Sequence, residues 1–204
     1  MKVSQISDIS AGYQFRGRVQ PDAAGNVAVL QVKDLKGDGL HNSIDRASLA
    51  TVTFEKDPSR YLLSSGDVLF LSRGSRVFAT AFKDVPPNVI IPNYFYRLRP
   101  KRADSAATTV LPEYLAWYLN SPKAQAQLRL VHAGSHMPVV SMNDFLDLTI
   151  DVPPLSVQQS IVAVAALAQR EQQLLRELLN LKKQLIDHVC DMAVSKQSER
   201  KKTR

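Results

Sequence analysis

The sequence predicts an α+β protein, in which a strand-rich globular domain is followed by one long C-terminal helix. Up to about residue 110, short apolar runs alternate with turn residues. From residue 111 to 148 apolar residues recur at helical spacing, and no proline or glycine follows Pro154. We therefore expect a globular domain over residues 1–152, a long helix over 153–194, and a basic, disordered tail over 195–204.

Strands are predicted where β-branched and aromatic residues are dense and are flanked by turn residues. The runs concerned are 26–32, 67–73, 76–82 and 88–100. Only Gly74-Ser75 separates the second run from the third, which is typical of a β-hairpin. Pro92 has no amide hydrogen, so the last run is expected to bend there or to lie at a sheet edge.

Two amphipathic helices are predicted next, at 111–121 and 123–132. Pro112 suits the first turn of one, and Pro122 separates the two.

Two capping boxes are then expected. Ser141 with Asp144 predicts a short helix, followed by a closing strand at 149–152. Ser156 with Gln159 predicts that the long helix starts there, with its first helical residue at 157 and its end near 194.

The long helix carries an apolar seam at the alternating three- and four-residue spacing of a coiled coil. Its apolar members are Leu167, Leu174, Leu178, Leu181, Leu185 and Met192. A second apolar row beside the seam suits a bundle with more than one neighbour. We expect this helix to pair with another chain in a coiled coil or bundle, because a single helix exposing so much leucine would not stay alone.

Three details of this helix stay open at the level of sequence. Its first turns, with Ile161 and Val164, are suited to packing on the globular domain. Glu171 and His188 fill the remaining seam positions. They either fix the register of pairing or point to water.

Composition excludes several classes of protein. The chain has 204 residues and 45% hydrophobic content, which is enough for a buried core. No apolar run is long enough for a bilayer span or a signal peptide, so a soluble cytoplasmic protein is expected, with no membrane partner. The single cysteine, Cys190, has no partner for an internal disulfide or a cysteine metal site.

The sequence offers no catalytic constellation. It lacks a glycine-rich phosphate loop, a nucleophile elbow and a zinc-protease helix, and its four histidines lack metal-like pairing. We therefore predict a binding component with no catalytic residues, no metal site and no cofactor of its own.

Charge favours double-stranded DNA as the ligand. The net charge is +7 and the pI about 9.6, and basic proteins favour polyanions. Between residues 73 and 102 there are seven basic residues and one acid. The expected DNA contacts fall in three groups, which are Arg73, Ser75 and Arg76 at the hairpin, then Arg97, Arg99, Lys101 and Arg102, and third Arg16 and Arg18.

Four stretches resemble one known family, the specificity (S) subunits of type I restriction-modification systems. "VPPLSVQQSI" (152–161) is similar to the V-P-P-L-x-x-Q-x-x-I stretch of that family, with Val157 where a glutamate is frequent. "LAWYLNS", "LLSSGDVLFLSRGS" and "GSHMPVVSMNDFLDLTIDVPP" resemble the family's Y-L-N-S-like helix, its Gly-Asp hairpin and its approach to the two prolines. The resemblance is strongest from 111 to 165.

The resemblance implies a DNA target recognition domain, followed by a spacer helix that docks the methyltransferase (modification) subunit. Family members carry two such halves with antiparallel helices, whereas this chain has one. A homodimer reading a bipartite, palindromic site is therefore implied. S-adenosylmethionine is expected on the partner methyltransferase only, and a restriction subunit is a further partner that the resemblance allows. The alternative is a coiled-coil interaction or regulatory protein with only non-specific affinity for DNA.

Overall fold

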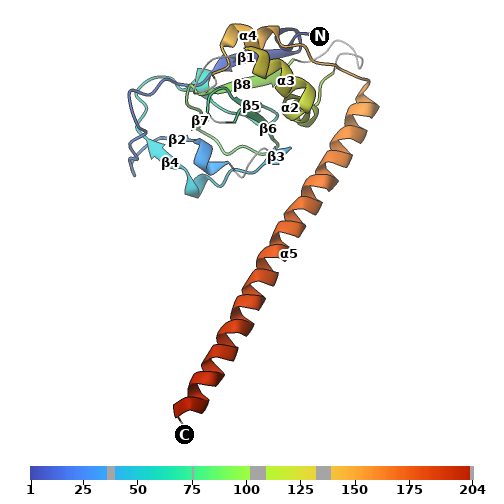
Figure 1. Ribbon diagram of the computed structural model, residues 1–204. Coiled ribbons are helices and arrows are strands. Elements are labelled where there is room, and N and C mark those ends of the chain that lie inside the picture. Colours follow the sequence, from blue (N-terminus) through green and yellow to red (C-terminus); the bar gives the residue numbers. More distant parts are fainter. Residues whose placement is uncertain (36–39, 75, 102–108, 132–138, 203–204) are drawn as a thin grey trace. The chain divides into compact units, whose positions relative to one another are not determined.

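The computed structural model describes residues 1–35, 40–74, 76–101, 109–131 and 139–202. By its internal contacts the chain divides into two units, Met1–Ala163 and Val164–Arg204. The first unit holds two β-sheets and the shorter helices (Figure 1). The α-helices are α1 (Val3–Ile6), α2 (Pro112–Asn120), α3 (Pro122–Val131), α4 (Met142–Asp147) and α5 (Leu155–Lys202), and short 3-10 helices lie at Val32–Asp34, Arg46–Ser48 and Ser59–Tyr61.

The larger sheet has five strands in the order β1-β8-β5-β6-β3. Their bounds are Ser7–Ala11 (β1), Phe95–Pro100 (β8), Val68–Leu71 (β5), Phe78–Phe82 (β6) and His41–Asn42 (β3). All neighbours are antiparallel except β3 and β6, which are parallel. The predicted hairpin is confirmed, since Leu71 of β5 lies opposite Phe78 of β6.

The smaller sheet has the order β4-β2-β7, with strands Ala50–Val52, Val27–Val29 and Val89–Ile90. Strand β2 pairs antiparallel with β4 and parallel with β7. The run predicted at 88–100 therefore divides around Pro92 into β7 and β8, which belong to different sheets. This confirms the expected bend, and it lets one segment of chain connect the two sheets.

Alternation along the strands separates three apolar cores. Val68 and Phe70 of β5 point into a core shared with the helices, whereas Leu69 and Leu71 point into a second core between the sheets. The second core also holds residues of the smaller sheet, such as Ala28. The other face of the smaller sheet forms a third core, which includes Val27 and Val29 and is covered by aromatic residues. Each sheet is thus buried on both faces.

The stretch "LAWYLNS" in and just after helix α2 connects that helix to the larger sheet. The Asn120 side chain accepts a hydrogen bond from the Ala79 amide (2.8 Å) and donates one to the Ala79 carbonyl (2.7 Å). It therefore pairs with the backbone of β6 as a neighbouring strand would. Tyr114 donates from its hydroxyl to the Asp151 carbonyl (2.7 Å), and Tyr118 donates to the Asp151 carboxylate (3.2 Å). These contacts fix the segment just before the two prolines.

The predicted closing strand at 149–152 is wrong. Thr149 makes one isolated bridge with Lys2, and Ile150 exchanges two hydrogen bonds with Met1. The pairing stops there because α1 begins at Val3, so the partner segment turns into a helix. The short helix expected after Ser141 is confirmed as α4, since the Ser141 hydroxyl accepts from the Asp144 amide.

The start of the long helix differs from the predicted capping box. Helix α5 begins at Leu155, so Ser156 already lies inside its first turn, and the Val157 and Gln158 amides donate to the Pro154 carbonyl. The buried glutamine is Gln158 and not Gln159. Its side chain accepts from the Leu111 amide (2.9 Å) and donates to the carbonyls of Thr109 (2.8 Å) and Pro153 (2.8 Å). The buried side-chain amide of Gln158 has partners for its donors and its acceptor, and these bonds stabilise the helix start more than an exposed capping box would.

The first turns of α5 therefore belong to the globular unit. Ile161, one turn after Gln158, packs against the core that the helices share, as expected, whereas Val164 is 68% exposed. Helix α5 continues past the predicted end at 194 to Lys202 and so enters the segment 195–204, which the sequence predicts as a disordered tail. That segment contains neither proline nor glycine, the residues that most disfavour a helix.

Candidate nucleic-acid interface

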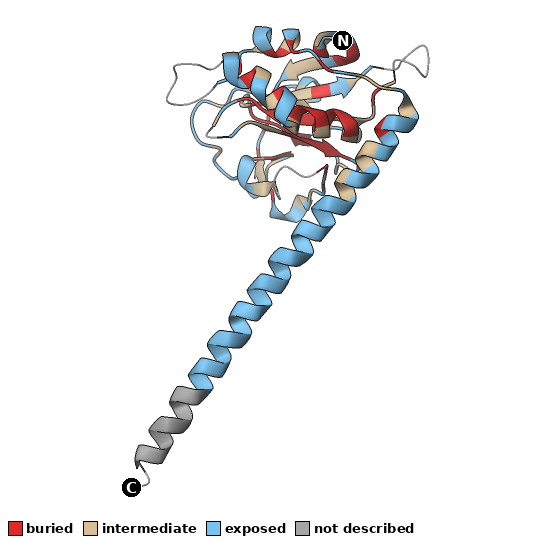
Figure 2. Ribbon diagram, turned by 45° about the vertical axis from the view of Figure 1, so that its right-hand side comes forward, coloured by how far each residue is buried: buried red, intermediate tan, exposed pale blue. Residues whose placement is uncertain are grey.

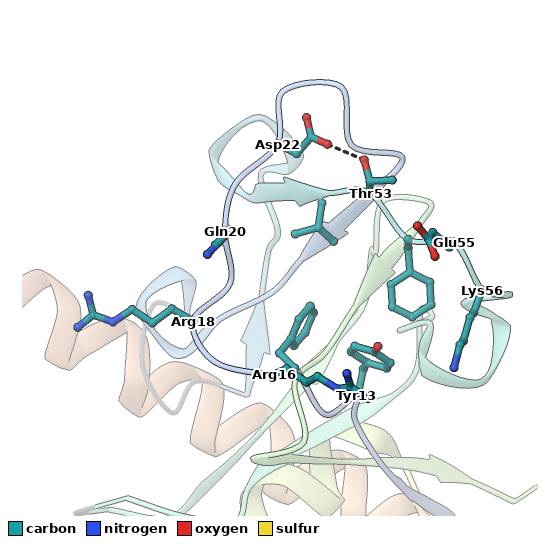
Figure 3. A pocket seen from close by; sticks show the side chains of 11 residues that line it. Tyr13, Arg16, Arg18, Gln20, Asp22, Thr53, Glu55 and Lys56 are labelled. Carbon is teal, nitrogen blue, oxygen red and sulfur yellow. Dashed lines mark hydrogen bonds between the residues drawn. The ribbon is translucent and has the colours of Figure 1, made fainter.

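A hollow of about 550 Å³ opens on the outer side of the third core, over the smaller sheet. The segment 13–22 forms one side of it and the segment 52–56 forms the other (Figure 3). These two segments are 30 or more residues apart in the sequence. They meet because β2 pairs with β4, and because Thr51 donates to the Asp22 carbonyl.

Aromatic rings form the base of this hollow. The ring of Tyr13 lies edge-on to those of Phe54 (4.8 Å between centroids), Phe15 (4.9 Å) and Tyr61 (5.2 Å). Such edge-to-face contacts fix ring orientations as well as burying apolar area. The segment that follows Tyr13 therefore starts from a rigid base.

Gly12 places Tyr13 on this base. The Gly12 amide donates to the Phe95 carbonyl of the larger sheet, and the Tyr13 amide donates to the Ile91 carbonyl. A Cβ atom on Gly12 would lie 2.3 Å from the carbonyl oxygens of Ile91 and Pro92, so only glycine permits this close approach. The chain crosses from the larger sheet to the rim of the hollow at this point.

Three exposed cations, Arg16, Arg18 and Lys56, line the hollow. In Figure 3 the Arg16 side chain extends toward Tyr13, and that of Arg18 extends away from the other lining residues. The acids in the lining are Asp22 and Glu55. Asp22 accepts from the Thr53 hydroxyl (2.5 Å) and the Ala24 amide (2.9 Å), and these bonds lower the pKa of its carboxyl. Asp22 thus holds the two walls together in its ionised form.

A second hollow, of about 390 Å³, shares Phe15 and Arg18 with the first. A third, of about 580 Å³, shares Asn93 with the second. The largest is lined by Arg60 and Arg73, and its lining contains no acid. We call the side chains of Arg16, Arg18, Lys56, Arg60 and Arg73 the cationic surface. Phosphates and base edges are the groups that such a surface, with aromatic rings between its cations, is suited to bind.

Of the two hairpin arginines, Arg73 belongs to this surface, because it lines the largest hollow. Arg73 is exposed, and its backbone forms a bridge with Val139. Arg76 is exposed on the other side of the turn. Ser75, predicted as a third contact, lies outside the described residues. Ser72, by contrast, is fully buried, and its amide and hydroxyl both donate to the Tyr94 carbonyl.

The second predicted cluster has internal partners. Arg99 forms a two-pronged ion pair with Asp67, at 2.7 and 2.8 Å, and the Asp67 hydrogen bond raises the pKa of Arg99. Asp67 is 1% exposed at its side chain and also accepts from the Ser64 amide, so it closes the turn that contains Gly66 (φ 86°). Arg99 and Asp67 therefore connect the Gly-Asp turn to β8, and the geometry favours a structural role for Arg99.

The other members of that cluster are held in different ways. Arg97 donates to the Leu62 carbonyl, and burial lowers the pKa of its guanidinium. Its Nε is buried and has no partner in the part of the chain that the structure describes. Lys101 donates to the Ser4 carbonyl (3.0 Å) and lies 3.7 Å from Asp8. Arg102 is outside the described residues.

The structure brings together functional candidates that the sequence analysis leaves out. These are Lys56 and Arg60, and the rings of Tyr13, Phe15, Phe54 and Tyr61. A local signal exists for two of the rings, because "YQFRGR" (13–18) places two aromatic residues and two arginines within six positions. No local signal exists for Lys56 and Arg60, which reach the surface through strand pairing and loop closure.

The predicted seam of the long helix is exposed along its length. Leu167 is 72% exposed, and Leu174, Leu178, Leu181, Leu185 and Met192 are between 45% and 64% exposed. In Figure 2 the ribbon of α5 beyond its first turns is coloured as exposed wherever its residues are described. Among the described residues, none form a group of three or more His, Cys, Asp or Glu that could hold a metal ion. Across the same residues, no helix has the length and apolarity to cross a bilayer.

Comparison with known proteins points to one family. A sequence model of the type I restriction modification DNA specificity domain matches residues 1–181. No curated protein matches the chain.

Solved structures share the fold. One, titled the structural basis underlying complex assembly and conformational transition of the type I R-M system, is 21% identical with a TM-score of 0.55, covering 85% of this chain and 38% of that chain. The HsdS subunit from Thermoanaerobacter tengcongensis is 20% identical with a TM-score of 0.53, covering 86% and 38%. The type I S subunit from M. genitalium is 11% identical with a TM-score of 0.51, covering 92% and 43%. The chain thus spans less than half the length of each.

Proposed function

The chain belongs to the family of type I restriction-modification DNA specificity domains, and from this premise we propose that it is the DNA sequence-recognition subunit of a type I-like complex. It performs no chemistry itself. The observation that carries the proposal is the cationic surface, which follows the three hollows of the globular unit. Arg16, Arg18 and Lys56 line the hollow over the aromatic base, and Arg60 and Arg73 line the largest hollow.

The chemistry of that surface fits DNA better than a small anion. Arginine can hold a phosphate or form two hydrogen bonds with the edge of guanine in the major groove. Arg16 and Arg18 project from a short segment fixed at Gly12 and Tyr13, so the segment loses little conformational freedom on binding. Arg73 of the hairpin belongs to the same surface, and Arg76 is exposed on the other side of the hairpin turn. We assign base reading to the 13–18 segment and the hairpin, and backbone contact to Lys56 and Arg60.

The exposed seam supports pairing of two chains through α5. Two copies carry two recognition domains, and a twofold protein reads a palindromic target in two half-sites. The helix also serves as the docking surface for the methyltransferase subunit, which carries S-adenosylmethionine. A restriction subunit completes the complex in hosts that encode one. The second apolar row, with Leu175, Leu179 and Ile186, leaves a face of α5 for this docking.

Selection from a random duplex library tests the proposal. We expect a split, palindromic consensus for the native chain. The double variant Arg16→Ala/Arg18→Ala should lose roughly tenfold to a hundredfold in affinity for that site and show a shallower salt dependence. Arg129→Ala removes an exposed arginine from α3, on the helix side of the larger sheet, and is the matched control that should bind normally.

The outcomes separate the two functions that the sequence left open. Salt-sensitive binding without any consensus would favour the alternative, an interaction protein with only non-specific DNA affinity. An unchanged consensus and affinity for the Arg16→Ala/Arg18→Ala variant would remove the 13–18 segment from the interface. The molar mass of the chain in solution, alone and with a co-expressed methyltransferase subunit, tests the two partner assignments.

A further inference from the structure

The seam of α5 reads the same from both ends. Its positions from 167 to 192 follow the spacing 4, 3, 4, 3, 4, 3, 4, and all lie in the part of the helix whose side chains are exposed. The order of residues is Leu167, Glu171, Leu174, Leu178, Leu181, Leu185, His188 and Met192. Glu171 is the second member of the series and His188 is the second from the other end. The two polar residues are therefore placed symmetrically about the midpoint between Leu178 and Leu181.

This symmetry matters when a second copy lies antiparallel to the first. With the twofold axis at that midpoint, Leu178 of each copy meets Leu181 of the other, and Leu174 meets Leu185. Leu167 then meets Met192, and Glu171 meets His188. Every apolar seam residue faces an apolar residue, and each acid faces an imidazole. Such layers, in which one seam position meets the alternate one, are those that antiparallel helices form.

We propose that two copies of the chain pair through α5 in this antiparallel register, and that the Glu171–His188 pair between copies selects it. The inference rests on the homodimer of the proposed function, with the antiparallel helices that the family resemblance implies, and adds the register and the residues that select it. The paired stretch, 167–192, is about 38 Å long at 1.5 Å per residue. It lies wholly within the unit Val164–Arg204.

Other arrangements of two copies lose this match. Parallel helices in register would set Glu171 against Glu171 of the second copy, and like charges facing one another are destabilising. An antiparallel shift by one heptad in one direction sets Glu171 against Leu181. A shift in the other direction sets His188 against Leu178. In each shifted case a polar side chain is desolvated against leucine without a partner, which is costly.

The pair itself has compatible chemistry. A glutamate accepts hydrogen bonds only, and an imidazole has an N–H to donate whether it is neutral or protonated. One polar layer within an apolar seam is known to fix register and oligomeric state while it lowers stability. Glu171 and His188 are both exposed in the single chain. Substituting them therefore leaves the fold of one chain undisturbed, and changes in association report on the pairing alone.

Charge reversal tests the selecting pair. In the full-length chain, Glu171→Lys sets a lysine against His188, and His188→Glu sets two glutamates together. We expect each single variant to weaken dimerisation by roughly tenfold or more, and the double variant Glu171→Lys/His188→Glu to recover most of the loss. Sedimentation equilibrium gives the dissociation constants. Lys183→Glu, a charge reversal on the face of the helix opposite the seam, is the control. Additive losses in the double variant would overturn the proposed pair.

Disulfide trapping tests orientation and register directly. In a Cys190→Ala background, chains with Leu174→Cys and chains with Leu185→Cys are prepared with tags of different length. The register requires that neither variant cross-links alone and that the mixture gives a cross-linked species containing both tags. The register is wrong if either variant cross-links with itself. It is also wrong if the protein is a dimer but the mixture gives no cross-linked species with both tags. In both cases the homodimer itself stands. A monomer would overturn the register and the homodimer together, and the library selection still reports on DNA reading independently.

Discussion

Two parts of the globular unit use polar side chains in opposite ways. Between residues 111 and 163, polar groups point inward and end on backbone atoms, as Gln158, Asn120 and Tyr114 do. Between residues 13 and 60, Arg16, Arg18 and Lys56 point outward over a packed aromatic base. The first part carries three of the four stretches that resemble the family. None of those four stretches lies in the second part, although it holds the surface best suited to DNA.

The difference explains why a family resemblance does not locate the binding residues. Asn120 belongs to the Y-L-N-S-like stretch, Asp67 to the Gly-Asp hairpin and Gln158 to the stretch with two prolines. Each joins segments that are far apart in the sequence. Connections of this kind depend on one side-chain length and one hydrogen-bonding pattern. Residues that read different DNA targets carry no such requirement.

Asp67→Ala should give the largest effect on stability. It removes the acceptor of both Arg99 bonds and of the Ser64 amide at a side chain that is 1% exposed. We expect a loss of about 3 kcal/mol in the free energy of unfolding, since Arg99 is half exposed and regains water. Urea denaturation measures it. Asp8→Ala, which breaks only the exposed contact with Lys101, is the control. The DNA consensus of folded Asp67→Ala should be unchanged, and an altered consensus would contradict the structural role.

Gln158→Ala should give the next largest effect. It leaves the Leu111 amide and the Thr109 and Pro153 carbonyls without their buried partner, which costs about 2 kcal/mol. Its neighbour Gln159 is exposed and offers a matched control, so Gln159→Ala should change the free energy of unfolding by less than about 0.5 kcal/mol. The comparison is made by urea denaturation. An equal loss in the free energy of unfolding for the two variants would contradict the role of Gln158 and would favour the capping box that the sequence predicts.

The hairpin between β5 and β6 contains both kinds of residue within a few positions. Arg73→Ala/Arg76→Ala should weaken binding to the selected DNA site by roughly tenfold and leave the free energy of unfolding nearly unchanged. Ser72→Ala should do the reverse, with a loss of about 1 kcal/mol in stability and normal affinity, because Ser72 is buried on the Tyr94 carbonyl. Fluorescence anisotropy with the selected duplex measures affinity. Normal DNA binding by the double arginine variant would remove the hairpin from the interface.

Tyr114→Phe should give only a small change in the free energy of unfolding at neutral pH, and this change should depend on pH in alkaline solution. Burial raises the pKa of its hydroxyl to about 12. The unfolded chain therefore ionises first, and the native protein loses stability as the pH rises from about 10 to 12. Tyr114→Phe lacks this titration, so its deficit of about 1 kcal/mol at pH 8 should shrink as the pH approaches 12. Urea denaturation at several pH values checks this. A deficit that stays constant with pH would contradict the raised pKa.

The sequence by itself determined the periodic features of this protein. The short link Gly74-Ser75 between two apolar runs predicted the hairpin, and proline at 92 predicted the bend between β7 and β8. Helical spacing predicted α2, α3 and the long helix with its exposed seam. These features depend on neighbours within a few residues, which is the range over which backbone geometry repeats. The family resemblance followed from the same local patterns.

Tertiary structure alone decided which polar residues face inward. The sequence grouped Arg97 and Arg99 with the hairpin arginines by charge. Pairing of β8 with β5 brings Arg99 to Asp67 and Arg97 to Leu62. The tertiary structure also buries Gln158 and leaves Gln159 exposed, and it brings Lys56 to the hollow that Arg16 lines. The physical reason is that a hydrogen bond or an ion pair requires its partner within about 3 Å, and here the partner comes from a distant part of the chain.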